Sequence, residues 1–480
     1  MQTETPHLAQ LPFKISRLCA DSRKLLAGDT FVAYPGEKSD GRTFIPQAIA
    51  RGASAVLWEP ANFKWQDDWV IANQPLPQLR KKIGFLAHEV NGLPSHHLWV
   101  IGVTGTNGKT SCAHWLGQSL TKLGRKTAII GTLGNGFHGE LAATANTTPD
   151  AITLHEQLRT FLDQGASAVA MEVSSHGLVQ GRVNGVVFDV AILTNLSRDH
   201  LDFHGSMQAY ENAKAMLFSW PELRYAILNR DDALGLKLSQ HLDSDAKIIT
   251  YGITAGDVHC QGLKVNAQGI KFDAVTPQGR APIASQLLGV FNVYNLLATL
   301  SALLASGIDL MSAARVLEQL EPVPGRMQTL GAAGQALVVI DYAHTPDALG
   351  KVLISLKEIL PARGRLICVF GCGGERDHGK RPMMGEVATR LANLTILTSD
   401  NPRSENPRAI IDEIVSGASG DYQIIEDRAQ AIQQAIQLAN SNDIVLIAGK
   451  GHESYQEIAG VKLPFDDASA AKTALERGLA

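Results

Sequence analysis

Residues 103–111 constrain the possible folds more than any other part of the chain, and they read Val-Thr-Gly-Thr-Asn-Gly-Lys-Thr-Ser. An apolar run at 98–101 precedes them, and apolar residues at helical spacing follow them. This context predicts a strand, a glycine-rich turn and a helix. Because the N–H groups of such a turn and the positive end of the helix attract anions, the sequence indicates an α/β fold with a polyphosphate site.

The residues of this loop have predictable roles. Gly105 and Gly108 lack a Cβ, which lets the backbone approach a phosphate closely. Lys109 would supply a positive charge, and Thr110 a hydroxyl for Mg²⁺. The glycine spacing departs from the strict P-loop pattern because Val103 stands where the first glycine is expected. An ordinary glycine-rich turn is the alternative, but Gly-Lys-Thr at the start of a helix favours the phosphate site.

The length of 480 residues exceeds what one core can organise and predicts about three domains. Lys and Arg number 43 and Asp and Glu 47, so the net charge of −4 leads us to expect no nucleic-acid partner. A signal sequence and an 18-residue apolar window are both missing, which predicts a cytoplasmic protein without membrane insertion. The five cysteines lack paired spacing, which argues against a zinc site.

Breaks in the pattern divide the chain into predicted domains at 1–90, 91–323 and 324–480. The first reads as a small α/β domain with strands at 30–34 and 53–58. A polar, Pro-containing stretch at 74–78 and a helix to about residue 90 close it.

The other two domains alternate strands with helices, which predicts parallel sheets. We expect a central P-loop ATPase-like sheet with an antiparallel subsheet at 258–288, and a C-terminal Rossmann-like α/β domain. The predicted central strands are 98–101, 126–130, 168–173 and 186–193, and a helix follows at 292–304. The predicted C-terminal strands are 337–340, 365–370, 394–398 and 444–448.

Polar residues gather where these predicted strands end, which is where parallel sheets bind ligands. Glu172 and His200 are the most informative of the central ones. A helix-capping carboxylate and a surface histidine are the simpler interpretations of these two residues. The charged stretches of the last domain are 341–344, 375–381, 400–403 and 449–453.

Together, the motifs at 104–110, 172–176, 341–346 and 449–453 closely resemble those of the Mur ligases, which add amino acids to peptidoglycan precursors. The resemblance covers essentially the whole chain. Asp-Asn-Pro-Arg at 400–403, together with Gly-Lys-Gly-His-Glu at 449–453, is similar to the members that add meso-2,6-diaminopimelate to the D-Glu γ-carboxylate of UDP-MurNAc-L-Ala-D-Glu. The resemblance implies that ATP phosphorylates this carboxylate and that the amine then attacks the acyl phosphate, with ADP and phosphate released.

The resemblance also implies the nucleotide and metal sites. The expected ATP contacts are Gly105, Thr106, Asn107, Gly108, Lys109, Thr110, Ser111, Asn295, Arg326 and Asp341. The expected Mg²⁺ ligands are Thr110 and Glu172 for one ion and His200 and Lys214 for another, and Lys109, Glu172, His200 and Lys214 are the expected catalytic residues. Lys214 matches the family lysine that reacts with CO₂, and its carbamate would offer Mg²⁺ an anionic oxygen. By its own sequence, Lys214 reads as a solvated helix residue.

The two remaining substrates would contact residues of all three domains. The expected contacts of UDP-MurNAc-L-Ala-D-Glu are Ser22, Glu37, Lys38, Ser39, Asn146, Thr147, Thr148, Ser174, Gln180 and Arg182. The expected contacts of diaminopimelate are Arg376, Asp400, Asn401, Pro402, Arg403, Gly449 and Glu453. Taken singly, such hydroxyls and amides are more often caps or turn residues. Arg403 can bind a carboxylate with two N–H groups, while Asp400 and Glu453 suit an ammonium. We expect a monomer.

Three other functions stay open at this point. A lysine-adding member of the family would share most of these motifs. A folylpolyglutamate synthase would share the loop and the acyl-phosphate chemistry but would lack Asp-Asn-Pro-Arg. A P-loop ATPase would hydrolyse ATP and form no bond. A degenerate structural paralogue is hard to reconcile with intact Gly-Lys-Thr, Glu172, His200 and Lys214.

Overall fold

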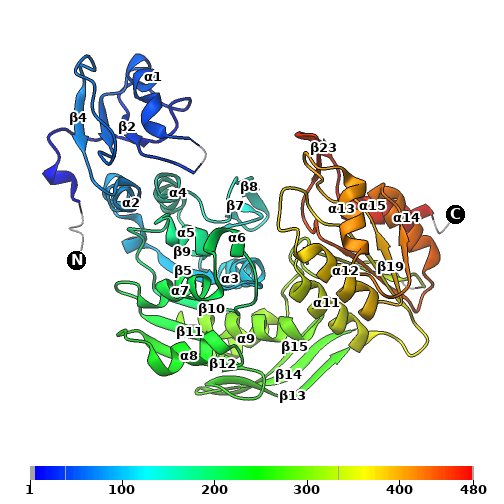
Figure 1. Ribbon diagram of the computed structural model, residues 1–480. Helices are drawn as coiled ribbons and strands as arrows, with labels where there is room; N and C mark the ends of the chain where they lie inside the picture. The colour runs from blue at the N-terminus through cyan, green and yellow to red at the C-terminus, as the bar shows by residue number, and fades with distance from the viewer. Residues whose placement is uncertain (1–5, 38, 267, 333, 478–480) are drawn as a thin grey trace.

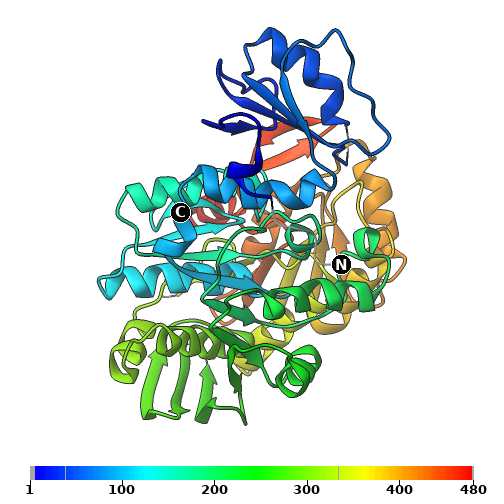
Figure 2. The same ribbon diagram turned by 90° about the vertical axis from the view of Figure 1, so that its left-hand side faces the viewer.

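The computed structural model describes residues 6–37, 39–266, 268–332 and 334–477. Lys38, an expected uridine-side contact, lies outside this part of the chain. Three large sheets follow one another along the sequence, as Figure 1 shows in blue, in cyan to green, and in yellow to red. Figure 2 shows the N-terminal sheet above the central one. The predicted α/β fold with three sheet-containing regions is therefore confirmed.

The N-terminal sheet is parallel and has the order β1-β2-β3-β4. Its elements are β1 (Leu18–Cys19), β2 (Thr30–Ala33), α1 (Ile45–Ala50), β3 (Ala55–Trp58), β4 (Ala72–Pro75) and α2 (Leu79–Val90). The sequence predicted only a polar connection near Gln74, and this was wrong because Gln74 pairs with Leu57 of β3 in a fourth strand. Apolar side chains of α2 pack against this sheet and against helix α4 (Ala151–Asp163) of the central region.

The central sheet has eleven strands in the order β15-β14-β13-β12-β11-β10-β5-β9-β6-β7-β8. They are β5 (Trp99–Thr104), β6 (Thr127–Gly131), β7 (Gly134–Phe137), β8 (Glu140–Ala142), β9 (Ala168–Glu172), β10 (Val190–Leu193), β11 (Tyr225–Asn229), β12 (Lys247–Gly252), β13 (Val258–Asn266), β14 (Gly269–Thr276) and β15 (Gly279–Ser285). The middle strands are parallel, and β13 to β15 form the predicted antiparallel subsheet. This subsheet continues the main sheet, because β12 and β13 pair in parallel.

Helices cover both faces of the central sheet (Figures 1 and 2). They are α3 (Lys109–Lys122), α4 (Ala151–Asp163), α5 (Ser175–Val179), α6 (Leu201–His204), α7 (Met207–Ala215), α8 (Ala233–His241), α9 (Val290–Ala305) and α10 (Leu310–Leu317). Within β5, Val100 faces one core and Ile101 the other, as expected for a strand buried on both sides. Because β5 lies between β10 and β9, the loop after it leaves the sheet near its middle.

The C-terminal sheet has the order β16-β17-β21-β18-β19-β20, with only β16 antiparallel. Its elements are β16 (Gln328–Leu330), β17 (Leu337–Asp341), α11 (Pro346–Ile359), β18 (Leu366–Phe370), α12 (Lys380–Leu391), β19 (Leu394–Leu397), α13 (Pro407–Val415), β20 (Tyr422–Ile424), α14 (Arg428–Leu438), β21 (Ile444–Ala448) and α15 (Asp467–Arg477). Separate cores on its two faces match the predicted Rossmann-like arrangement. A hairpin of β22 (Tyr455–Ile458) and β23 (Val461–Pro464) stands outside this sheet.

No helix among the residues described is long and apolar enough to cross a membrane. All five cysteines are buried and free.

Candidate active site

The phosphate loop lies between β5 and α3, and its shape requires glycine at two positions. Gly105 and Gly108 have φ values of +148° and +87°, which L side chains rarely adopt. A Cβ on Gly105 would lie 1.8 Å from Thr194 Oγ1, and one on Gly108 would lie 2.5 Å from Asn295 Oδ1. The loop is therefore fitted closely against the end of β10 and against α9. The predicted strand, loop and helix are confirmed.

Residues that follow β10 hold the backbone of the loop in place. Asn195 accepts from Asn107 N through Oδ1 at 3.0 Å, and its main-chain oxygen accepts from Thr106 N at 2.8 Å. Thr194 Oγ1 donates to Asn107 O at 2.6 Å. These bonds orient the loop before a ligand arrives, which lowers the entropy lost when the ligand binds.

Two lysine amines converge on one carbonyl oxygen of this loop. Lys109 Nζ donates to Gly105 O at 2.8 Å, and Lys214 Nζ, from α7, donates to the same oxygen at 2.7 Å. Lys214 is only 1% exposed, although the sequence alone favoured a solvated residue. Burial, followed by the positive charge of Lys109, holds the pKa of Lys214 well below its ordinary value. Both effects increase the share of the neutral amine at this position.

A buried carboxylate faces the start of α3. Glu172, at the end of β9, is fully buried and accepts from Thr110 Oγ1 at 3.0 Å. It also accepts from Thr132 N at 2.7 Å and Thr132 Oγ1 at 3.2 Å. Among the described residues, no lysine, arginine or histidine forms an ion pair with it within 4.0 Å. The carboxylate of Glu172 thus has no counter-ion in the described part of the chain, and together with the Thr110 hydroxyl it provides oxygen ligands of the kind that Mg²⁺ prefers.

His200 lies near Lys214 but makes different contacts. Its Nε2 atom is 3.3 Å from Asp199 Oδ2, and its side chain is 43% exposed. Partial desolvation by the surrounding chain lowers the pKa of His200 to about 4 in spite of that carboxylate. The Tyr210 ring lies between the two predicted ligands, with its centroid 4.5 Å from Lys214 Nζ and 6.1 Å from the centre of the His200 ring. Within the described chain, no three His, Cys, Asp or Glu side chains form a ready metal cluster. A metal ion at this place would therefore need oxygen atoms from a bound substrate or from a modified lysine.

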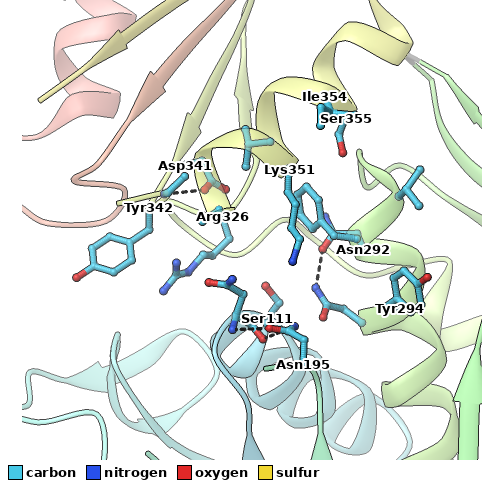
Figure 3. A pocket seen from close by; sticks show the side chains of 18 of the residues that line it. Ser111, Asn195, Asn292, Tyr294, Arg326, Asp341, Tyr342, Lys351, Ile354 and Ser355 are labelled. Carbon is cyan, nitrogen blue, oxygen red and sulfur yellow. Dashed lines mark hydrogen bonds between the residues drawn. The ribbon is translucent and has the colours of Figure 1, made fainter. Parts of the chain in front are cut away.

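A cavity of about 480 Å³ opens beside the loop, between the central and C-terminal sheets (Figure 3). Asn107, Gly108, Ser111 and Asn295, four of the expected ATP contacts, line it from the central side. The other wall comes from the end of β17 and from α11, whose Lys351 points into the cavity in Figure 3. Its position at the ends of parallel strands and its size suit a nucleotide.

Arg326 and Asp341 bring the C-terminal region to the phosphate loop, as expected. Arg326 Nη2 donates to Thr110 Oγ1 at 3.3 Å, and its guanidinium lies 4.5 Å above the centre of the Tyr342 ring. Asp341 accepts from Met327 N and Ala343 N, both at 2.8 Å. Burial raises the pKa of Asp341, and Arg326 opposes that shift. The two sheets thus share one polar site.

Five of the ten predicted sugar-peptide contacts form one hydrogen-bonded group. Arg182 Nη1 donates to Thr148 O at 2.8 Å, and its Nε donates to Gln180 Oε1 at 2.7 Å. Thr148 Oγ1 donates to Ser174 Oγ at 3.1 Å. Gln180 also donates to Glu37 of the N-terminal region. This group therefore spans two of the sheets, with Thr147 next to it through a 3.0 Å contact to Thr132.

Three other predicted contacts of this substrate are separate from that group. Ser22 is buried and donates to Gln47 Oε1 at 2.8 Å. Ser39 and Asn146 are exposed. No hydrogen bond among the described residues joins Ser22, Ser39 or Asn146 to the group around Arg182, so the structure does not bring the whole predicted set together.

The predicted diaminopimelate contacts meet at the ends of β19 and β21. Asn401 Nδ2 donates to Glu453 Oε2 at 2.7 Å. A Cβ on Gly449 would lie 2.7 Å from Asp400 Oδ2, so only glycine permits this approach. Arg403 Nη1 donates to Gly374 O at 2.7 Å. Pro402 lies between these residues in the same loop, whereas Arg376 is exposed on the neighbouring loop.

This group is continuous with the cavity beside the phosphate loop. Gly449 N donates to Asp341 O at 3.2 Å, and Asp341 lines the cavity. One polar edge of the C-terminal sheet therefore joins the phosphate loop to the 400–403 loop.

Sequence reasoning missed several residues of the site. Lys450 is fully buried and donates to Asn401 Oδ1 at 3.0 Å and Glu453 Oε2 at 3.2 Å. Because Lys450 is part of the Gly-Lys-Gly-His-Glu motif, its place in the sequence could have indicated that it belongs to the site. Thr132, Tyr342 and Lys351 also belong to the site, but only their positions near strand ends hinted at this.

Comparisons with known proteins agree with this arrangement. Three family models match in chain order: the Mur ligase family catalytic domain at 14–83, the Mur ligase middle domain at 103–303, and the Mur ligase glutamate ligase domain at 325–451.

Two curated bacterial proteins and two solved structures extend the comparison. Proteins named UDP-N-acetylmuramoyl-L-alanyl-D-glutamate--2,6-diaminopimelate ligase from Chromobacterium violaceum and Nitrosomonas europaea are 52% and 50% identical, over 98% of this chain and 96% and 94% of theirs. A solved structure of the same name is 39% identical, with a TM-score of 0.70, over 97% of this chain and 96% of that one. A folylpolyglutamate synthase from Mycobacterium tuberculosis is 17% identical, with a TM-score of 0.64, over 81% of this chain and 93% of that one, and resembles the chain in fold alone.

Proposed function

The chain belongs to the Mur ligase family, and from this premise we propose that it joins meso-2,6-diaminopimelate to UDP-MurNAc-L-Ala-D-Glu at the expense of ATP. The product would be the tripeptide precursor of peptidoglycan. The observation that carries the proposal is the continuous polar edge that joins the phosphate loop, through Arg326 and Asp341, to the 400–403 loop. An ATPase that forms no bond has no need for this extension.

The residues suit transfer of phosphate to a carboxylate followed by attack of an amine. The D-Glu γ-carboxylate would take the γ-phosphoryl group from ATP, which gives an acyl phosphate and ADP. The neutral amine would then add to the carbonyl carbon, and phosphate would leave as the amide forms. Lys109, whose amine lies at the Gly105 carbonyl, and Arg326, which contacts Thr110, would supply positive charge where phosphate charge develops. Protein nucleophiles are not needed.

Thr110 and Glu172 are the residues that would hold a Mg²⁺ ion. The fit rests on a buried carboxylate without a counter-ion next to a hydroxyl. The ion would neutralise phosphate oxygens of ATP. We further propose that Lys214 carries a CO₂-derived carbamate, which with His200 would supply a second site. Support comes from the buried amine, whose lowered pKa favours the neutral form that reacts with CO₂.

The substrate sites extend to both sides of this centre. We assign the group around Arg182, with Glu37 and the more distant Ser22, Ser39 and Asn146, to the nucleotide-sugar peptide. We assign the loops at 400–403 and 449–453, with Arg376, to diaminopimelate. Arg403 would bind its distal carboxylate, and Asp400 and Glu453 its distal ammonium.

We also propose the domain boundaries, oligomeric state and location. The boundaries are 1–90, 91–323 and 324–480, and each matched family segment falls inside one of these ranges. The protein would act as a monomer in the cytoplasm, where ATP is available.

Phosphate release tests whether ATP turnover is tied to bond formation. With ATP and Mg²⁺, release should need both UDP-MurNAc-L-Ala-D-Glu and diaminopimelate, and omitting either should reduce the rate to background. Rapid release with neither acceptor would instead support a non-ligating ATPase.

Arg403 should make the enzyme prefer diaminopimelate to L-lysine. Lysine lacks the distal carboxylate and would leave the guanidinium without its ligand, at a cost of roughly 1–3 kcal/mol. Preference in kcat/KM should therefore be at least about tenfold. Arg403→Ala should lower kcat/KM for diaminopimelate and leave the weak use of lysine nearly unchanged.

The neighbouring Arg408 provides the control for this prediction. It is exposed and pairs with Asp412 on α13, so Arg408→Ala should leave the preference intact. Comparable turnover of lysine and diaminopimelate by the unmutated enzyme would contradict the assignment of Arg403.

A further inference from the structure

The hairpin of β22 and β23 has little apolar packing of its own. It forms a separate two-stranded sheet, and every residue of β23 is exposed. Val461 and Leu463 are 57% and 47% exposed. Figure 1 shows β23 at the end of the C-terminal region away from β13 to β15. An isolated two-stranded hairpin is marginal in water, so contacts elsewhere must hold it.

Those contacts are with the loop at 400–403. Arg403 N donates to Glu457 O at 3.0 Å, and Ala459 N donates to Arg403 O at 2.7 Å. Glu457 N donates to Asn401 Oδ1 at 2.9 Å, and Gln456 Nε2 donates to Asp400 O at 2.7 Å. These bonds also hold Arg403 at a φ of +50°, in the left-handed region that a non-glycine residue enters at a cost. The hairpin and the loop thus form one unit.

The side chains of Glu457 and Arg403 are paired as well. Glu457 Oε2 lies 3.5 Å from Arg403 Nε, while Arg403 Nη1 donates to Gly374 O. The two side chains are 24% and 19% exposed, so solvent screens the pair only in part. The ion pair on the Nε side and the hydrogen bond from Nη1 hold the guanidinium from two sides. The Nη2 group has no partner among the described residues and is left for a ligand.

We propose that Glu457 is a positioning residue that orients Arg403 for the distal carboxylate of the incoming amino acid. This inference rests on the proposed function, because it needs Arg403 to bind that carboxylate. A planar guanidinium recognises a carboxylate through two parallel hydrogen bonds only when its orientation is correct. Glu457 therefore contributes to the choice between diaminopimelate and lysine without touching either amino acid.

Glu457→Gln tests the proposal, since the amide keeps the size of the side chain and the main-chain bonds but removes its charge. We expect KM for diaminopimelate to rise about three- to tenfold and kcat to change less than about twofold. The KM values for ATP and for UDP-MurNAc-L-Ala-D-Glu should stay the same, and the preference over lysine should fall. Glu457→Asp should recover part of the loss.

Lys462→Gln, on β23 opposite Glu457, is the matched control. It changes a charge on the same hairpin and should leave all three KM values unchanged. If Glu457→Gln leaves KM for diaminopimelate unchanged, or raises all three KM values together with a lower Tm, the proposal is wrong.

Combination with Arg403→Ala separates this inference from the proposed function. If Glu457 acts through Arg403, Glu457→Gln should have no further effect in the Arg403→Ala background. An undiminished effect in that background would overturn the positioning role and leave the proposed function standing. A normal preference for diaminopimelate in Arg403→Ala would overturn both the positioning role and the assignment of Arg403 to the distal carboxylate, and the ligase reaction itself would still stand.

Discussion

Lys214→Ala should remove nearly all ligase activity, with kcat falling about a hundredfold or more. The Lys214 amine is buried and donates to Gly105 O of the phosphate loop. A lysine with no role beyond solubility would instead be exposed to solvent. As a carbamate, the side chain would gain the carbon of CO₂ on its nitrogen and release one proton to water. The change converts an amine, which offers Mg²⁺ no anionic oxygen, into an anion that attracts the ion. Initial rates at saturating substrates measure the loss.

Chemical rescue distinguishes the carbamate from a structural role of this lysine. Small carboxylates such as acetate should restore part of the activity of Lys214→Ala, and Lys214→Glu should retain more activity than Lys214→Ala. Lys237→Ala is the control, because Lys237 of α8 is exposed and pairs with Glu211 of α7, the helix that carries Lys214. In buffer that contains ¹³CO₂, the ¹³C NMR spectrum of the unmutated protein should show a carbamate resonance that the spectrum of Lys214→Ala lacks. Near-normal activity of the alanine variant, without that resonance, would rule out the carbamate.

Glu172→Gln should reduce kcat by about a hundredfold or more and raise the Mg²⁺ concentration needed for half-maximal rate. The amide can keep the contacts with Thr110 and Thr132 but carries no charge for the ion. Because the carboxylate is buried without an ion pair in the described structure, its removal should leave the free energy of unfolding unchanged or raise it. Titration of Mg²⁺ and urea unfolding measure these two effects.

Thr132→Val is the matched control for Glu172→Gln. It removes one hydroxyl donor from the carboxylate and keeps the charge, so it should change the Mg²⁺ requirement far less. If Glu172→Gln unfolded at much lower urea and kept its Mg²⁺ requirement, Glu172 would be a structural residue.

The phosphate loop could be predicted from sequence because its determinants are local. The apolar strand, the two glycines and Gly-Lys-Thr lie within a few residues of one another, and the structure places them as expected. Glu172 could be identified for a similar reason, since it ends a strongly apolar strand.

Short and polar strands could not be predicted. The strand β4 has half-exposed, polar side chains, and β7 and β8 are three to four residues long. Such strands are stabilised by pairing with neighbours that are distant in sequence, and their own residues carry little β propensity.

Contacts between segments that are distant in the sequence could not be predicted either. Nothing near Lys214 indicates that its amine reaches Gly105, and nothing near Glu457 indicates that it faces Arg403. The Thr132 contact with Glu172 depends on the neighbouring positions of β6 and β9 in the sheet. These pairs follow from strand order and loop packing, which a single sequence does not fix.

The most direct test of the central claim is the mass of the product formed when diaminopimelate and L-lysine compete at equal concentration. The enzyme would receive ATP, Mg²⁺ and UDP-MurNAc-L-Ala-D-Glu, and phosphate would be measured in the same reaction. We predict one major product, heavier than the acceptor by one diaminopimelate residue, with one phosphate released per product. A lysine adduct as the major product, or phosphate release without any adduct, would contradict the account.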